Sequence, residues 1–414
     1  MASNSTPLSS YQIRLLAVLA LINFVNFADR TVIVPLLPLL RQQMHLTDSQ
    51  LGSLQTGLLV VLALASWPCG FFADRMSRTR IIAGGIVFWS LATVLCGFAP
   101  SFMFLLVARS LIGVGEAAYA PAAQSMISDS FPYERRANAQ AIFASGMLLG
   151  GAAGQAFGGL AGESYGWKYT VILIGLVCLV PVLFVVKLPE PPRRPRSEVL
   201  PIWKLLSVPA YVAMLFAGTC ITFSSVSLLT WGIDFARDYK EFSLRQAAVS
   251  LALVALLSLL LGVLTGGFLA DRLHRKYPYG RILVIAAGFL FAAPFVLLAI
   301  QTDEKWVFLA ALFISGYFMS WYHGPVTAVL HDLTPQRAHS SAIGVYMFVT
   351  QLLGALGPQL VGKISDASDL QLGLQVATGV MVLGALLMFL VIYFVRRDGL
   401  HHPSLAAFRL EGND

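Results

Sequence analysis

Long apolar stretches alternate with short polar segments along the whole chain. Twelve such stretches can be marked, and each is close to the roughly 20 residues that a helix needs to cross a lipid bilayer. They cover residues 14–40, 51–73, 81–99, 102–128, 137–162, 167–187, 208–235, 245–270, 281–300, 305–331, 338–364 and 372–395. This pattern predicts an all-α polytopic membrane protein with twelve transmembrane helices.

One connection differs from the others. Residues 188–207 are rich in proline and arginine. Proline cannot continue a helix, and like charges in a short segment repel one another. We therefore expect an N-terminal six-helix bundle over residues 1–187, a linker over residues 188–207, and a C-terminal six-helix bundle over residues 208–414 that ends in a short tail.

The composition supports this interpretation. Apolar residues make up 57% of the chain and charged residues only 12%, whereas soluble domains contain about 45–50% and about 25% respectively. A water-soluble globule of this composition would lack the charge to cover its surface. The same numbers exclude intrinsic disorder.

The distribution of positive charge predicts the orientation. A net charge of +7 would suggest nucleic-acid binding in a soluble protein. Here 19 of the 28 Lys and Arg residues lie on the side of both termini and the linker, and seven lie in the opposite loops. The positive-inside rule therefore places both termini and the linker in the cytoplasm, and we expect no nucleic-acid partner. The short loops indicate a bacterial inner-membrane protein.

Two motifs recur in the two halves. The second stretch is followed by Gly70-Phe-Phe-Ala-Asp74-Arg75-Met-Ser-Arg78, and the eighth by Gly267-Phe-Leu-Ala-Asp271-Arg272-Leu-His-Arg275, with six of nine positions identical. A second echo pairs Asp129-Ser-Phe-Pro132 with Asp332-Leu-Thr-Pro335. Two matches in corresponding places indicate duplicated halves of equal orientation, which is a plan found in transporters.

The repeated Gly-x-x-x-Asp-Arg-x-x-Arg loop in a twelve-span chain resembles the signature of the major facilitator superfamily. The resemblance implies two pseudo-symmetric six-helix bundles in the major facilitator fold, which work by rocker-switch alternating access. It also implies a conformational latch in which Asp74 and Asp271 meet helix N-termini of the other half, near Ala338 and Ala137. We assign to this latch Gly70, Asp74, Arg75, Arg78, Gly267, Asp271, Arg272 and Arg275. Ordinary positive-inside arginines would explain the charges equally well, but not the repeated Gly and Asp.

A narrower resemblance lies in the first and fourth stretches. Asn26-Phe-Ala-Asp29-Arg30 and Arg109-Ser-Leu-Ile-Gly-Val-Gly-Glu116-Ala-Ala-Tyr119 are similar to segments of the Spinster lipid transporters, although this chain has Ala118 where that family typically has serine. The resemblance implies proton-dependent or facilitated movement of lysophospholipids, sphingolipids or similar amphiphiles. The expected partners are thus a lipid-like substrate, protons and membrane lipids, and the expected state is a monomer.

Four ionisable residues fall within these spans: Asp29, Arg30, Arg109 and Glu116. An intramembrane charge is costly and needs a partner or water. Arg109 and Glu116 are seven residues apart and share one helix face. We hypothesise that Asp29 or Glu116 takes a proton and that Arg30 holds the acidic head of a substrate. The alternative is a static ion-pair network between the two helices.

Further residues are assigned to substrate binding. In the first half these are Asn26, Arg30, Arg109 and Tyr119; in the second they are Trp321, His323 and Tyr346. Histidine titrates near neutral pH and could join a proton relay, although a single hydrogen-bonded histidine is the more common case.

Four glycines, Gly150, Gly154, Gly158 and Gly162, form a ladder at a spacing of four. Such a face lets another helix pack closely, and we expect the eighth span to meet it across the interface of the two halves.

No catalytic constellation, metal-ligand spacing or cofactor motif stands out, so we expect no enzyme, metal or cofactor. Two other functions remain open. One is a proton-driven multidrug or small organic anion transporter of the same fold. The other is a lipid scramblase or channel-like facilitator.

Overall fold

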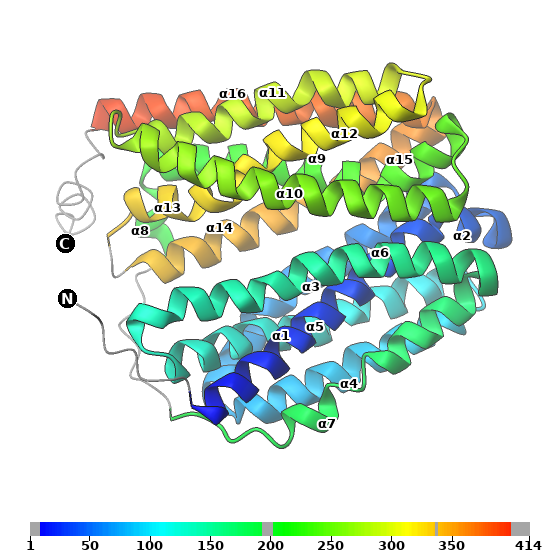
Figure 1. Cartoon of the computed structure of the whole chain (residues 1–414), viewed down its shortest axis with the longest axis horizontal. Coiled ribbons are helices and arrows are strands. Elements are labelled where there is room, and N and C mark those ends of the chain that lie inside the picture. The colour runs from blue at the N-terminus through cyan, green and yellow to red at the C-terminus, as the bar shows by residue number, and fades with distance from the viewer. Residues whose placement is uncertain (1–8, 193–201, 336–337, 399–414) are drawn as a thin grey trace. The chain divides into compact units, whose positions relative to one another are not determined.

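The computed structural model describes residues 9–192, 202–335 and 338–398, and every regular element in these ranges is a helix (Figure 1). Residues 193–201 of the expected linker, Arg337 and the C-terminal tail from residue 399 lie outside the described residues, as do the surroundings of Gly70 and the side chain of Asp74.

The first half of the chain contains eight elements. They are α1 (Ser10–Val32), the 3₁₀ turn η1 (Val34–Leu36), α2 (Leu37–Met44), α3 (Asp48–Arg75), α4 (Arg78–Gly97), α5 (Phe102–Ser130), α6 (Tyr133–Val177) and α7 (Val182–Val185).

The described residues of the second half form ten elements. They are α8 (Ile202–Leu206), α9 (Pro209–Lys240), α10 (Leu244–His274), α11 (Gly280–Gln301), α12 (Lys305–Met319), the 3₁₀ turn η2 (Ser320–Tyr322), α13 (His323–Asp332), α14 (His339–Gly354), α15 (Gly357–Ala367) and α16 (Leu370–Asp398).

Ten stretches of the described residues are long and apolar enough to cross a membrane. One of them, Asn138–Val185, is too long for a single span of about 20 residues. It is divided at Gly166, whose φ of 77° interrupts α6. The segment from α12 to α13 is not among the ten because η2 breaks it into shorter helices. The helices therefore agree with twelve spans, and the prediction of an all-helical polytopic membrane protein is confirmed.

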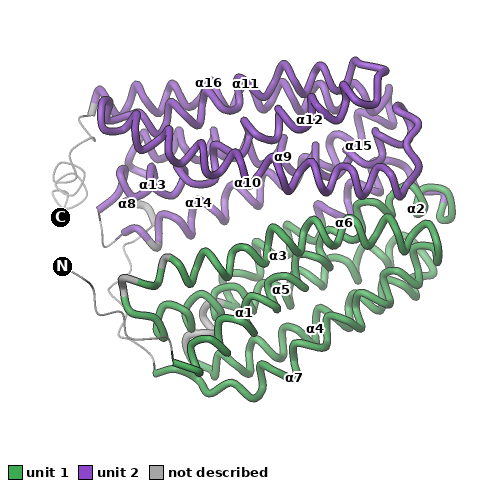
Figure 2. Tube along the Cα trace, in the orientation of Figure 1, with its two compact units in different colours: residues 1–44, 57–195 green, residues 45–56, 196–414 purple. Residues whose placement is uncertain are grey.

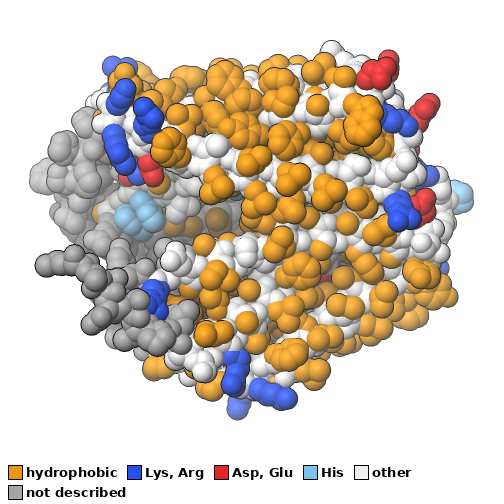
Figure 3. Space-filling view, in the orientation of Figure 1, with side chains coloured by type: hydrophobic (Ala, Val, Ile, Leu, Met, Phe, Trp, Pro, Cys, Tyr) orange, Lys and Arg blue, Asp and Glu red, His pale blue; other side chains and the backbone are white. Residues whose placement is uncertain are grey.

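Large apolar side chains are exposed on the outer faces of the helices. In α10, for example, Leu264 is 72% exposed and Phe268 is 69% exposed. Figure 3 shows hydrophobic side chains over the middle of the helices and charged ones toward the helix ends. A soluble protein rarely exposes so much contiguous apolar surface, whereas the lipid core of a membrane requires it.

The chain separates into two compact units (Figure 2). Unit 1 comprises residues 1–44 and 57–195, and unit 2 comprises residues 45–56 and 196–414. The boundary near residue 195 lies within the linker expected from the sequence.

The start of α3 groups with unit 2 because it is bound there by α15. The carboxylate of Asp366 accepts hydrogen bonds from the backbone N–H groups of Asp48 (2.8 Å) and Ser49 (2.9 Å). The Thr56 hydroxyl donates to the Ala355 carbonyl at 2.6 Å. A carboxylate at a helix N-terminus satisfies orphan N–H groups and opposes the positive end of the helix dipole.

The glycine ladder of α6 packs against α1 inside unit 1. A Cβ added to Gly150 would lie 2.1 Å from the Phe24 carbonyl oxygen, and one added to Gly154 would lie 2.2 Å from the Ala28 carbonyl oxygen. We expected the eighth span to pack against this face of α6. At Gly150 and Gly154 that expectation is wrong, because α1 packs there. The two backbones approach so closely that only glycine fits.

This contact predicts a loss of stability when Gly154 is replaced by valine. The new side chain would push α1 away from α6, and overpacking of this kind costs about 1–3 kcal/mol. Thermal unfolding of the purified protein in detergent measures the effect.

Gly84→Val in α4 is the matched control, since the structure leaves open space beside Gly84. Equal melting temperatures for the two variants would contradict the predicted role of the α1–α6 contact.

Candidate functional site

Asp29 and Arg30 lie in the last helical turn of α1. The helix ends at Val32, and Pro35 in η1 lacks the N–H that would continue the helical hydrogen bonds. Asp29 and Arg30 are therefore next to a break within the first span. Consecutive residues of a helix point about 100° apart, so these two side chains face different neighbours.

Arg30 faces α5 and forms an ion pair with Glu116. Its Nε lies 3.0 Å from Oε2 of Glu116, and its Nη2 contacts the same oxygen. The Glu116 side chain is fully buried, whereas that of Arg30 is 16% exposed. The guanidinium also lies over the ring of Phe27, 4.6 Å from its centroid. Arg30 is therefore the member of the pair that a solute could reach.

Asp29 faces α4 and accepts a hydrogen bond from Thr93. The distance from Thr93 Oγ1 to Asp29 Oδ2 is 2.8 Å, and Asp29 is fully buried. Its other oxygen, Oδ1, has no hydrogen-bond partner among the described residues. Thr93 was not among the site residues expected from the sequence.

Arg109 binds the end of α1. Its Nη2 donates to the Arg30 carbonyl oxygen at 2.7 Å, while its Nε has no partner in the described part of the chain. A cation at the C-terminal end of a helix satisfies free carbonyls and suits the negative end of the dipole. The structure thus brings the four predicted charges together, and we call Asp29, Arg30, Arg109 and Glu116 the charge cluster.

Asn26 and Tyr119 lie inside unit 1, each 1% exposed. The Tyr119 hydroxyl donates to Asn23 Oδ1 at 2.8 Å, and Asn23 Nδ2 donates to the Phe143 carbonyl at 2.7 Å. These bonds connect α5, α1 and α6 beside the charge cluster. Asn23 was missed because a polar residue in an apolar stretch gives no sign of which helix it faces.

The predicted residues of unit 2 form a mainly aromatic group. The hydroxyls of Tyr346 and Tyr322 are 2.7 Å apart and hydrogen bonded, and the ring of Tyr322 is 5.6 Å from that of His323. His323 is exposed, whereas Trp321 packs over Gly266. Tyr322 was not predicted.

Unit 2 also has a buried carboxylate that the sequence analysis did not single out. Asp234, six residues before the end of α9, is fully buried. It lies near a helix end, so its position along the sequence did not mark it as intramembrane.

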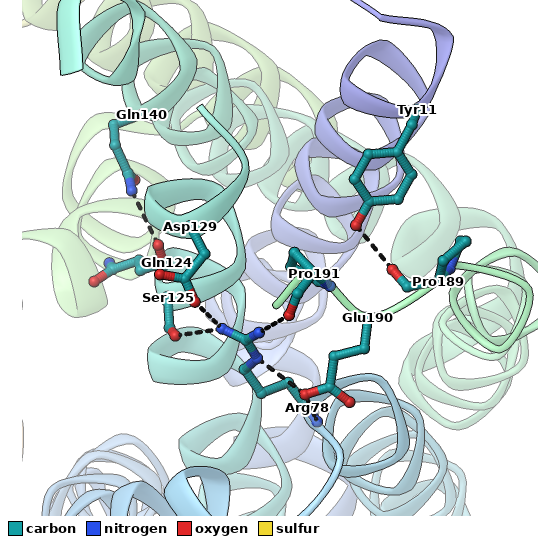
Figure 4. Close-up of polar contacts among 9 residues, drawn as sticks. All are labelled: Tyr11, Arg78, Gln124, Ser125, Asp129, Gln140, Pro189, Glu190 and Pro191. Carbon is teal, nitrogen blue, oxygen red and sulfur yellow. Dashed lines mark hydrogen bonds and ion pairs between the residues drawn. The ribbon is translucent and has the colours of Figure 1, made fainter. Parts of the chain in front are cut away.

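Arg78 is held at the first residue of α4 by bonds to two other segments of unit 1 (Figure 4). Its guanidinium donates to Asp129 (2.5 Å) and Ser125 (2.9 Å) of α5, and to Glu190 (3.1 Å) and the Pro191 carbonyl (2.6 Å) of the linker. The Arg78 side chain is only 3% exposed. We call Arg78, Ser125, Asp129, Glu190 and Pro191 the Arg78 junction.

The start of the linker has a second attachment in the same region. The Tyr11 hydroxyl of α1 donates to the Pro189 carbonyl at 2.8 Å (Figure 4). Residues 189–191 are thus fastened to α1 and α4 through Tyr11 and Arg78. The sequence predicted only that proline would end the helix here.

In unit 2 the counterpart of Arg78 is Arg281 rather than the expected Arg275. Arg281 of α11 pairs with Asp271 (3.0 Å) and Asp332 (2.8 Å), whereas Arg275 is exposed just after α10. Arg281 follows Arg78 by 203 residues, the same offset that separates Asp332 from Asp129. That offset was the signal that could have identified Arg281.

Of the other latch residues whose burial the structure describes, Asp271 is exposed and Gly267 is partly buried. Arg75 and Arg272 are exposed, and Asp271 is occupied by Arg281. A Cβ added to Gly267 would meet nothing within 4 Å in the described structure.

Comparisons with known proteins agree on one family. The family model described as "Major Facilitator Superfamily" matches residues 19–358 and 278–409 of this chain. Protein spinster homolog 1 of Bos taurus is 28% identical over 390 residues, covering 86% of this chain and 74% of the relative. An MFS-type efflux pump of Mycolicibacterium smegmatis is 26% identical over 397 residues, covering 92% of each.

A solved structure has the same fold. It is the crystal structure of a bacterial homolog to the human lysosomal transporter Spinster, in an inward-facing and occupied conformation. It superposes with a TM-score of 0.83 at 23% sequence identity, over 94% of this chain and 99% of that one.

Replacing Arg78 with alanine is expected to destabilise the protein by about 3 kcal/mol, because removing one partner of a buried ion pair leaves its carboxylates unmatched. Thermal unfolding in detergent measures the loss. Arg80→Ala is the control, since Arg80 is exposed two residues away. A melting temperature for Arg78→Ala equal to that of the control would contradict the structural role of the Arg78 junction.

The stability of the Arg78 junction should also depend on pH. Burial alone would raise the pKa of Glu190, but hydrogen bonds from Ser77 and from the backbone and side chain of Arg78 outweigh it and lower that pKa overall. Glu190 therefore stabilises the fold above its unfolded pKa of about 4.3, and this contribution is lost as pH falls through the lower folded pKa. Between about pH 5 and pH 3, the wild type should lose more stability than Glu190→Gln, as measured by unfolding temperature. Parallel curves for the two proteins would refute this assignment.

Proposed function

Because the chain belongs to the major facilitator superfamily and is a secondary transporter related to the Spinster family, we propose that it moves an amphiphilic, lipid-like substrate by proton-coupled alternating access. It is a multi-pass membrane transporter and not an enzyme. Lysophospholipids and sphingolipid-type molecules are the proposed substrates, and the bacterial inner membrane with cytoplasmic termini is the proposed location.

The proton proposal rests on a difference between two buried carboxylates: one has an ion-pair partner among the described residues and the other does not. Glu116 has its charge matched by Arg30, whereas Asp29 accepts a single hydrogen bond from the described residues, and its donor is the neutral hydroxyl of Thr93. An ionised carboxylate that is buried without an ion-pair partner is costly, and a proton removes that cost. We therefore assign the coupling proton to Asp29 and keep Glu116 as its charged neighbour.

Arg30 is the proposed contact for the acidic group of the substrate. Its side chain is partly exposed while that of Glu116 is not. A phosphate or carboxylate can form the same paired hydrogen bonds with a guanidinium as Glu116 does. An anionic headgroup that draws Arg30 away would leave Glu116 without its cation, which couples substrate binding to the protonation of the cluster.

The aromatic group of unit 2 suits the apolar part of such a molecule. Tyr346 and Tyr322 satisfy each other's hydroxyls, so their rings present an uncharged surface. We propose that Trp321, His323 and Tyr346 contact the substrate together with Asn26, Arg109 and Tyr119. The repeated Gly and Asp residues near the ends of α3 and α10 are proposed to latch one conformation, and the transporter is proposed to act as a monomer.

The Mycolicibacterium smegmatis relative supports a second candidate. That relative is named an MFS-type efflux pump, so the same fold with the same coupling could expel lipophilic drugs or organic anions. A lipid scramblase or channel-like facilitator is the alternative of another class, and it would equilibrate substrate without responding to a pH gradient.

Flux into proteoliposomes tests the proposal. Lysolipids, sphingoid bases and lipophilic drugs are screened at two pH values, with and without a pH gradient. Gradient-driven uptake of one amphiphile class is expected, and Asp29→Asn should reduce it about tenfold or more, because a buried coupling site has no substitute. Glu116→Gln should weaken uptake and its pH dependence.

Glu163→Gln is the matched control, since Glu163 is an exposed glutamate of α6 in unit 1. Unchanged, still pH-dependent transport in both Asp29→Asn and Glu116→Gln would defeat the proton role. Equal flux with and without the gradient in the wild type would favour the scramblase or channel.

A further inference from the structure

Most helical threonines in this protein bond back to their own helix. The hydroxyl donates to the carbonyl four residues earlier, which is a common habit of threonine in helices. This holds for Thr31, Thr170, Thr219, Thr230, Thr265, Thr350 and Thr378.

Thr93 departs from this habit. Its hydroxyl donates across to Asp29 of α1 at 2.8 Å. Both residues are fully buried, and the sequence separation is 64 residues. The only hydrogen bond that the structure gives to the Asp29 carboxylate therefore comes from Thr93, among the residues described.

Other groups act on Asp29 through space. The charged groups that interact with it electrostatically are Arg109, Glu116 and Arg30 of the charge cluster. The carboxylate also interacts electrostatically with the thiols of Cys96 and Cys178. None of these side chains is joined to Asp29 by a hydrogen bond in the described structure. Thr93 is thus the group that fixes the direction of the carboxylate.

We propose that Thr93 is a positioning residue for the proton on Asp29, and that its hydroxyl reverses its hydrogen bond when that proton binds or leaves. A hydroxyl can both donate and accept. It donates to the ionised carboxylate; when Asp29 carries the proton, it accepts from the Asp29 O–H and turns its own hydrogen toward the Trp89 carbonyl, four residues earlier in α4. The Asp29 carboxyl group is then hydrogen bonded to Thr93 in both protonation states, and the coupling proton is the only atom gained or lost.

This inference rests on the proposed assignment of the coupling proton to Asp29. A hydrogen bond to the ionised form stabilises that form. Its removal therefore lets Asp29 hold the proton to higher pH. Thr93 also bonds to the protonated form, but the charge-assisted bond to the ionised form is the stronger one. The difference between the two bonds corresponds to a shift of about one pH unit.

The experiment compares three variants. Thr93→Val keeps the shape but lacks the hydroxyl, and it should move the midpoint of the transport pH profile upward by about one unit. Thr93→Ser keeps the hydroxyl and should restore the midpoint. Thr170→Val is the matched control, because Thr170 is equally buried in unit 1 but bonds to its own helix.

A second measurement detects the protonation of Asp29 without a transport assay. Infrared difference spectra of the purified protein are recorded against pH, and the protonated-carboxyl band that disappears in Asp29→Asn belongs to Asp29. Thr93→Val should shift both the frequency and the pH midpoint of that band, while Thr170→Val should leave both unchanged. If Thr93→Val does not fold, Thr93→Ala serves as the second hydroxyl-free variant.

The outcomes separate this inference from the proposed function. If Asp29→Asn leaves transport pH-dependent while Thr93→Val still moves the infrared midpoint, the coupling proposal fails and the role of Thr93 stands. If Asp29→Asn abolishes coupling but Thr93→Val moves neither midpoint, the role of Thr93 is overturned. A band of Asp29 that does not titrate in the wild type would also overturn it.

Discussion

A charge that is kept from water must be matched inside the protein, and unit 1 matches its buried charges in two different ways. At the Arg78 junction the guanidinium donates to two carboxylates, a hydroxyl and a carbonyl. In the charge cluster, one oxygen of Asp29, one oxygen of Glu116 and the Nε of Arg109 lack partners among the described residues. In the first arrangement the hydrogen bonds of the guanidinium favour one geometry. In the second, atoms without partners can bind a proton or a ligand, and this would change the net charge of the cluster.

The charge cluster depends on how closely α1 packs against its neighbours. Glycines of α6 bring the backbone of α1 within contact at Phe24 and Ala28, and the helix then breaks before Pro35. The break exposes carbonyls that Arg109 satisfies. Apolar packing on one side of α1 therefore holds its polar last turn at a fixed distance from α4 and α5.

Much of the architecture could be predicted because its physical cause is local. Apolar length predicts spans, and proline predicts the end of the first bundle. The gathering of Asp29 and Arg30 with the charges of α5 could also be predicted, but not that Arg30 would pair with Glu116 while Asp29 met Thr93. That choice depends on which helix lies on each side of α1, and helical phase alone does not give the neighbours.

The repeated motif shows a second limit. Sequence identity aligned Arg78 with Arg275, yet α10 extends to His274 and the turn after it is longer than the turn after α3. The arginine that meets Asp332 therefore comes from the start of α11. The glycine ladder was likewise visible in the sequence, but its partner was α1 and not the eighth span, since a small-residue face does not specify what packs on it.

The abrupt bend of α6 at Gly166 has a practical consequence. The two helical parts of α6 are joined there by a single residue with positive φ, with open space where a Cβ would lie. The connection at Gly166 is therefore not a loop that a protease could cut. An epitope or fluorescent tag inserted there would interrupt a helix. Reporters at this end of the protein would have to be introduced by exchanging single exposed side chains such as Tyr165 or Tyr169.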